Sequence, residues 1–246
     1  MLVRIDWSLK PRRSSLVNFD HVPSTLKGQI VNITKSKRRV AEFGEVFTPQ
    51  WLVTDILDTV KMGSENWESR FLDPACGNGA FLVEVLKRKL DQVDATPDDR
   101  VERAIFALMS VYGIELQADN VVECRARLLA TFAQHFEMLE WADDLQAAKT
   151  VLRRNIVHGN GLTFQTSKGH NIHFFEWSYV PGGMYKSQKF RYAFNDRPPK
   201  RKSTSTAPNA FRSSLSVRKI GTSELWRISD LSAGRIQDIE EEWHAF

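Results

Sequence analysis

The clearest indication of the fold class is the stretch Phe71-Leu-Asp-Pro-Ala-Cys-Gly-Asn-Gly-Ala-Phe81. Phe71 and Leu72 predict a short buried strand, and the glycines at 77 and 79 predict a turn directly after it. From Ala80 to Leu90 the apolar residues recur at helical spacing, at positions 81, 82, 85 and 86. A strand, a glycine turn and a helix in this order form one βα unit, which is the repeating element of parallel α/β sheets.

Similar patterns lie on both sides of this unit. Pro49 opens a helical pattern of apolar residues, and further helices are predicted at 97–110 and along the stretch that contains Val121, Leu128 and Phe132. Strands are predicted at 111–115 and 156–157, with a fourth at 172–175. The alternation of strands and helices favours a doubly wound α/β sheet, whose ligands bind at the carboxyl ends of the strands.

The residues at this edge indicate the kind of ligand. Asp73 and Glu115 each end a predicted strand, and the glycine turn would offer backbone N–H groups. A dinucleotide fingerprint is not met, because a third glycine and an acidic residue about twenty positions on are both missing. The Gly-Lys-Ser/Thr of a triphosphate-binding loop is missing as well. Two carboxylates suit a ligand with a ribose and a cationic or zwitterionic end, and this predicts S-adenosylmethionine.

Four motifs in order resemble those of the adenine-specific amino-methyltransferases of DNA. They are Phe47-Thr48-Pro49, Asp73-Pro-Ala-Cys-Gly-Asn-Gly-Ala-Phe81, Gly113-Ile-Glu-Leu116 and Asn155-Ile-Val-His-Gly-Asn-Gly161. The resemblance covers about residues 43–164, and the Asp-Pro-Ala-Cys-Gly-x-Gly core is its most specific part. A first motif placed ahead of the glycine loop resembles the subgroup found in the modification subunits of restriction systems.

The resemblance implies a Rossmann-like class I methyltransferase fold that uses S-adenosylmethionine. In the family, residues equivalent to Phe47 and Thr48 close over the methionine part, which the Asp73 loop cradles. Glu115 would accept the two ribose hydroxyls, and Asn160, where the family usually has Asp, would face the adenine. The implied cofactor-binding residues are Phe47, Thr48, Pro49, Asp73, Pro74, Ala75, Gly77, Gly79, Glu115, Leu116 and Asn160.

The family's catalytic turn, Asp/Asn-Pro-Pro-Tyr/Phe, is absent from the chain. Such a turn accepts the hydrogens of the target amine and stacks on the flipped base. Two other stretches offer some of the same groups and supply weak catalytic candidates. These candidates are Glu176 and Tyr179 in the first stretch, and Asn195 and Asp196 in the second.

Three interpretations therefore stay open. The chain could be the cofactor-binding part of an adenine methyltransferase from a restriction-modification or phage system, with a partner subunit that supplies the catalytic turn or target recognition. It could be a degenerate, inactive methyltransferase that binds DNA or a protein. It could also methylate a different amine, such as that of cytosine or of a protein glutamine.

Charge is distributed unevenly along the chain, whose formal net charge is +4. Residues 1–39 hold nine basic and two acidic side chains, and residues 186–219 hold ten basic side chains with one acidic side chain. The stretch between them is acidic. We therefore predict a basic N-terminal arm at 1–42, a cofactor-binding domain at 43–180, and an irregular basic C-terminal region at 181–246 that could end in a helix.

Basic flanks of this kind are typical of proteins that bind a polyanion, although solvated tails would look the same. Double-stranded DNA is the expected partner, and the nucleic-acid candidates are Lys186, Lys189, Arg191, Lys200, Arg201 and Lys202. No run approaches the roughly 18 apolar residues of a membrane span. Two cysteines far apart in sequence, Cys76 and Cys124, build neither a disulfide framework nor a zinc site, and the pair His170 and His173 is too small for a metal centre. A soluble, cytoplasmic protein without a metal is expected.

Overall fold

The computed structural model describes residues 34–59, 66–93, 99–135, 142–180, 182–195 and 214–233. Its centre is a parallel sheet of β1 (Phe71–Asp73), β2 (Val111–Glu115) and β3 (Ile156–His158), in the order β1-β2-β3. Asp73 pairs with Gly113, and Glu115 pairs with His158. The three predicted strands are confirmed, and the two predicted carboxylates end neighbouring strands at one edge of the sheet.

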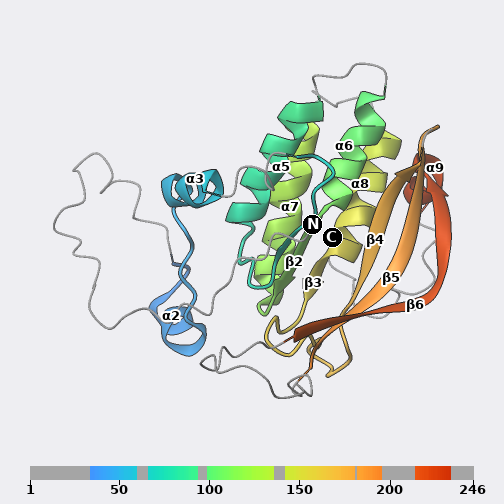
Figure 1. Ribbon diagram of the computed structural model, residues 1–246. Helices are drawn as coiled ribbons and strands as arrows, with labels where there is room; N and C mark the ends of the chain where they lie inside the picture. The colour runs from blue at the N-terminus through green and yellow to red at the C-terminus, as the bar shows by residue number, and fades with distance from the viewer. Residues whose placement is uncertain are drawn as a thin grey trace, which may run out of the picture.

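Four helices pack together beside this sheet (Figure 1). They are α5 (Ala80–Val93), α6 (Arg100–Met109), α7 (Ala118–His135) and α8 (Ala142–Asn155). In α5 the apolar residues at 82, 86, 90 and 93 follow helical spacing, and all four side chains are fully buried. The predicted helices at 80–90 and 97–110 correspond to α5 and α6, whereas sequence reasoning gave no helix for α8.

Two further helices precede the sheet. The helix α3 (Gln50–Asp58) starts directly after Pro49, as predicted. The helix α2 (Lys37–Phe43) lies inside the segment predicted to be an arm. Its start is capped by Ser36, whose hydroxyl accepts from the backbone N–H of Arg39, and its end by Gly44 in the left-handed conformation. The last part of the predicted arm is therefore helical, and the domain boundary near residue 42 stays a prediction.

The C-terminal part of the chain contains a second sheet, so the prediction of an irregular region is wrong for the described residues there. The strands β4 (His173–Val180), β5 (Met184–Asn195) and β6 (Ser214–Arg227) pair antiparallel in the order β4-β5-β6, and α9 (Ile228–Ser232) follows. In β5 aromatic residues alternate with polar ones, which is a strand pattern. The lysines and arginines of β5 are residues that solvated loops also favour, so the composition of this segment does not show the strand.

The predicted fourth strand belongs to this second sheet and does not extend the parallel one. β4 starts at His173 and carries Tyr179 to Asp99, the residue before α6, where the two side chains share a hydrogen bond of 2.9 Å. Asn155, the last residue of α8, anchors the antiparallel sheet to the parallel one. Its side chain donates to the carbonyls of Met109 and Val111 and accepts from the indole N–H of Trp177 on β4. The α/β class with a parallel sheet is confirmed, but a continuous doubly wound sheet of four strands is not observed.

No helix among the described residues is long and apolar enough to cross a membrane.

Candidate cofactor site of the N-6 DNA methylase type

The glycine loop lies between the end of β1 and the start of α5. Gly77 and Gly79 both have positive φ, at 53° and 84°, which favours glycine. A Cβ atom at position 79 would lie 2.6 Å from the Sγ of Cys124, so only glycine lets the loop approach α7 this closely. Cys76 and Cys124, which are distant in sequence, therefore lie next to each other at the loop. A hydrogen bond with Cys124, together with burial, holds the pKa of the Cys76 thiol well above its ordinary value.

Glu115 connects the loop to the end of β2. Its side chain is buried, with the residue 8% exposed, and Oε2 accepts from the backbone N–H of Gly77 at 2.9 Å. Oε1 accepts from the N–H of Gln117 at 2.8 Å and from Asn120 Nδ2 at 3.4 Å. The carboxylate is therefore fixed in place by donors on both sides of the sheet edge.

Asp73 lies at the same edge and carries an unusual ionisation. Its Oδ1 accepts from the N–H of Ala75 at 3.1 Å. Burial raises the pKa of Asp73 to about 6, and the negative charge of Glu115 adds to this effect, while the Ala75 hydrogen bond works against it. The site therefore holds two neighbouring carboxylates, and the ionisation of one of them is costly in the ligand-free protein.

Phe47 covers the loop from the N-terminal side. Two of its ring atoms lie 3.5 Å from the position that a Cβ of Gly77 would take, so the ring lies next to the loop at Gly77. The carbonyl of Pro49 accepts from the N–H groups of Leu52 and Val53, which places Phe47-Thr48-Pro49 at the start of α3. The structure thus brings the first motif, the glycine loop and Glu115 together, although they are distant in sequence.

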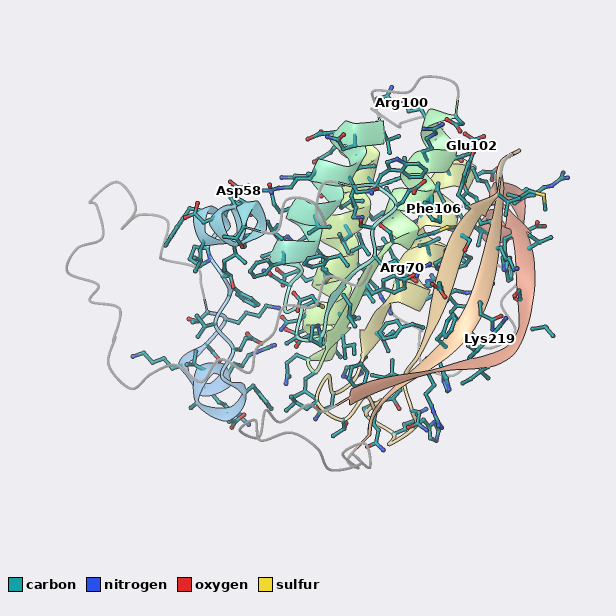
Figure 2. All side chains as sticks on the ribbon, viewed as in Figure 1. Asp58, Arg70, Arg100, Glu102, Phe106 and Lys219 are labelled. Atoms are coloured by element: carbon teal, nitrogen blue, oxygen red, sulfur yellow. The ribbon has the colours of Figure 1, made fainter. Side chains whose placement is uncertain are left out.

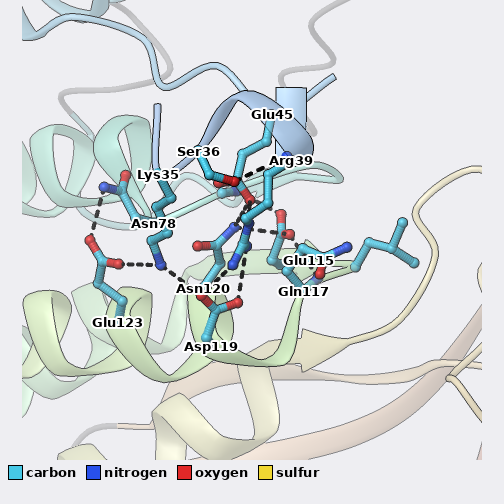
Figure 3. A network of polar contacts seen from close by, with 12 residues as sticks. Lys35, Ser36, Arg39, Glu45, Asn78, Glu115, Gln117, Asp119, Asn120 and Glu123 are labelled. Carbon is cyan, nitrogen blue, oxygen red and sulfur yellow. Dashed lines mark hydrogen bonds and ion pairs between the residues drawn. The ribbon is translucent and has the colours of Figure 1, made fainter. Parts of the chain in front are cut away.

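A polar network above this edge was missed by sequence reasoning (Figure 3). Arg39 on α2 donates to both Asp119 and Glu45, and its guanidinium holds the pKa of Asp119 well below the usual range. Asn120 donates to Glu45 at 3.0 Å and also to Glu115. Lys35 pairs with Asp119 and Glu123. The network ties α2 and the Phe47 segment to the start of α7, next to the glycine loop.

The segment after β3 closes the other side of the loop. A Cβ at Gly161 would lie 1.9 Å from the carbonyl oxygen of Pro74, so this glycine permits a direct backbone contact. Asn160 Oδ1 accepts from the N–H groups of Leu162 and Thr163, at 2.8 and 3.3 Å. The amide oxygen expected to face an adenine thus already caps a turn. Leu116, which is 49% exposed, uses its carbonyl to contact His158 Nε2 at 3.0 Å.

Comparison with known proteins identifies this arrangement. Residues 32–151, which include three of the four motifs, match the family described as N-6 DNA Methylase. The matched residues make up a little under half of the chain, and they are what the chain shares with that family. Over 74 residues the chain is 36% identical to the type II restriction enzyme and methyltransferase RM.BcgI of Heyndrickxia coagulans. That match takes in 30% of this chain and only 10% of the relative. No solved structure matches the chain.

The catalytic candidates are not gathered at the N-6 DNA methylase motifs. Glu176 forms an ion pair with Arg70, the residue before β1, and therefore lies at the opposite end of that strand from Asp73. Tyr179 donates its hydroxyl proton to Asp99. Nothing is described for the side chain of Asn195, and Asp196 lies outside the described residues.

The nucleic-acid candidates separate into groups. Lys189 and Arg191 share one face of β5, because side chains two apart in a strand point the same way. Lys186 is exposed and belongs to the other face. The remaining candidates, Lys200, Arg201 and Lys202, lie outside the described residues. Among the candidates that the structure describes, Lys189 and Arg191 therefore share a face, and their contact with nucleic acid stays a prediction.

Proposed function

We propose that this chain binds S-adenosylmethionine at the Asp73 loop and supplies the methyl donor for adenine methylation of DNA in a restriction-modification or phage system. The observation that carries this proposal is the contact between Gly77 and Glu115 beneath the ring of Phe47. It joins three motifs of an N-6 DNA methylase at one sheet edge. As an enzyme that acts on DNA, the protein would work in the cytoplasm.

The donor set fits this cofactor. Asp73 and Glu115 bring two carboxylates to one edge, and the raised pKa of Asp73 follows from burial without enough positive charge nearby. A ligand with a cationic end would relieve this cost. Oε2 of Glu115 accepts one hydrogen bond, from Gly77, and so keeps a lone pair for a ribose hydroxyl. At Oε1 the contact from Asn120 is long, at 3.4 Å, and a second hydroxyl could replace it. When bound, the cofactor supplies an electrophilic methyl group on a positively charged sulfur.

Within this site we assign a role to each group. Glu115 would orient the ribose, the ring of Phe47 would exclude water from the methionine part, and the Asp73 loop would hold that part through backbone N–H groups. Pro74 and Ala75 form the loop wall, and Gly77 and Gly79 give it its curvature. Leu116 is exposed beside Glu115, and Asn160 positions the segment that lies against Pro74.

The target amine needs acceptors that localise its lone pair, and among the described catalytic candidates Glu176 and Tyr179 are engaged away from the site. We propose that another subunit or segment supplies the catalytic turn. A second candidate function is a methyltransferase-like module that binds DNA or a protein without transfer. The engagement of Glu176 by Arg70 and of Tyr179 by Asp99 favours this candidate over independent catalysis by either residue.

Calorimetry with S-adenosylmethionine tests the proposal directly. We expect binding by the native chain and a loss of about 10- to 100-fold in affinity for Glu115→Gln, because hydrogen bonds to a charged acceptor contribute about 1.5–3 kcal/mol. Glu68→Gln is the matched control, since Glu68 is an exposed carboxylate outside the motifs. Failure of the native chain to bind at millimolar cofactor would overturn the proposal.

Transfer of labelled methyl groups separates the candidate functions. One oligonucleotide substrate contains adenine but no cytosine, and a second contains cytosine but no adenine. Transfer to one and not the other shows which amine is methylated. Binding without transfer to either substrate supports a missing partner or an inactive module. Transfer to the adenine substrate by the isolated chain would show that no partner is needed.

A further inference from the structure

A second cavity of about 760 Å³ lies apart from the glycine loop, between α8, the end of β3 and one face of the antiparallel sheet. Its floor is formed by Phe175 on β4 with Ser187 and Lys189 on β5. Exposed residues of the segments 166–171 and 221–224 form its rim, so it is open to solvent. We call it the β-sheet cleft.

The lining of the β-sheet cleft is strongly cationic. Four basic side chains contribute to it, against a single carboxylate, that of Glu224. The basic residues are Arg125, Arg153, Arg154 and Lys189, and the lining also contains the histidines His158, His170 and His173. Such an excess of positive charge in a concave site attracts anions.

The cationic groups in this cleft are held in place by aromatic rings. The guanidinium of Arg154 lies 4.4 Å from the centre of the Phe175 ring and 4.7 Å from that of Trp226. Lys189 Nζ lies 6.0 Å from the same Phe175 ring. Because these rings are fixed by packing, the charges are positioned before any ligand arrives, which reduces the ordering cost of binding.

Side chains along β5 alternate between the two faces of the antiparallel sheet, so the basic residues of this strand are divided between the face of the β-sheet cleft and the opposite face. Phe175 pairs with Lys189 and His173 pairs with Arg191, so these four residues lie on the face that forms the cleft. Burial, together with the charges of Lys189 and Arg191, lowers the pKa of His173, which reports a positive potential on this face. Lys186 and Lys219 belong to the opposite face and are exposed, and Lys219 is labelled in Figure 2.

The position of the cleft relates it to the cofactor edge. His158, which lines the cleft, pairs in the parallel sheet with Glu115. An anion bound in the cleft would therefore lie beside the cofactor site but would not compete for the carboxylates there. Phosphate groups on an extended polymer fit an open, cationic, aromatic-lined cleft at this place.

We propose that the β-sheet cleft binds the phosphate backbone of DNA. The choice of DNA among polyanions rests on the proposed function, whereas the cleft itself does not depend on it. Lys189 and Arg153 are the two residues whose charges contact phosphate, and Arg154 is a positioning residue stacked on Phe175.

The test is fluorescence anisotropy with a labelled duplex of mixed sequence, titrated at several salt concentrations with the full chain. The double variant Lys189→Ala, Arg153→Ala should bind about tenfold more weakly, and its dependence of log affinity on log salt should fall by about 1–2. The matched control, Lys186→Ala with Lys219→Ala, removes the same amount of charge from the opposite face and should stay within about twofold. Equal losses in the two double variants would overturn the proposal, because they would reflect net charge alone.

Two further measurements identify the ligand and separate this inference from the proposed function. Displacement of the duplex by adenosine monophosphate at matched phosphate concentration would assign the cleft to a small phosphate ligand and overturn the proposal for DNA. Thermal unfolding and calorimetry with S-adenosylmethionine are run on the same variants. Unchanged cofactor binding with weakened DNA binding supports the cleft. DNA binding that depends on Lys189 in a chain that binds no cofactor would leave the cleft in place and refute the proposed function.

Discussion

Replacing Asp73 by Asn should stabilise the protein at neutral pH and abolish cofactor binding. Burial raises the pKa of Asp73 from its ordinary 3.8 to about 6, so the folded state prefers the protonated acid and ionisation at neutral pH opposes folding. At about 1.36 kcal/mol for each pKa unit, this difference corresponds to about 3 kcal/mol. The Asn side chain keeps the acceptor for the Ala75 N–H but has no charge to desolvate.

The sign of the pH dependence follows from the same linkage. Between about pH 4 and pH 6 the folded state holds the proton while the unfolded state releases it, so the native protein loses stability as pH rises through this range. The variant lacks this loss. Its gain should therefore be about 3 kcal/mol at pH 7.5 and less than about 1 kcal/mol at pH 4. In a chain of this size the gain at pH 7.5 corresponds to about 6–12 °C in Tm.

Thermal unfolding followed by circular dichroism at both pH values measures the effect. Asp91→Asn is the control. Asp91 is exposed on α5, so this substitution removes one carboxylate without changing a buried site. Calorimetry on the same samples reports the loss of S-adenosylmethionine binding. A gain of the same size at pH 4 and pH 7.5, or a destabilised variant at pH 7.5, would refute the reasoning that Asp73 is held at an electrostatic cost for its ligand.

Three other substitutions test the contacts around the site. Arg39→Met should destabilise the chain by about 1 kcal/mol at neutral pH, with urea unfolding as the measurement and Lys37→Met as the control. The cost should shrink as pH falls below the ordinary pKa of Asp119, because the unfolded chain takes up a proton there while Arg39 keeps the folded carboxylate charged. Asn155→Leu should lower the free energy of unfolding in urea by about 3 kcal/mol, because it leaves two buried carbonyls and an indole N–H without their partner. A decrease of less than about 1 kcal/mol would contradict this anchoring role. Tyr179→Phe should cost about 1 kcal/mol and leave cofactor affinity unchanged, and a change in affinity would place Tyr179 at the cofactor site after all.

The cofactor edge could be predicted from the sequence because its parts are local. Asp73 and Glu115 each end a short apolar run, and parallel strands deliver their ends to one edge. The glycines at 77 and 79 mark the turn that makes room for α7. The resemblance implied that Phe47 closes over the methionine part of the cofactor. The ring lies against the loop at Gly77, and its contact with a cofactor stays a prediction.

The parts that escaped prediction depend on partners distant in sequence or on weak patterns. Arg39 and Asp119 are 80 positions apart, and no local signal connects them. The helix α8 is polar on average, and its buried face includes the small residues Ala147 and Ala148, so few large apolar residues mark it in the sequence. In β5 the alternation was hidden by Lys189 and its neighbours, since cations that line a concave cleft resemble a solvated loop when only the sequence is read.

The direction of β4 determines where a catalytic turn can come from. In a continuous parallel sheet, the next strand would deliver its carboxyl end to the edge that holds Asp73. Here β4 starts at His173, close to His158 at that edge, and ends near Asp99 at the start of α6. The residues after β4 are thus carried away from the glycine loop, and the β-sheet cleft occupies the side of the sheet edge next to β3. Under the proposed function the chain would hold its cofactor and a phosphate backbone on one surface, and the group that activates the adenine would enter from the side of β1, the outer strand of the parallel sheet.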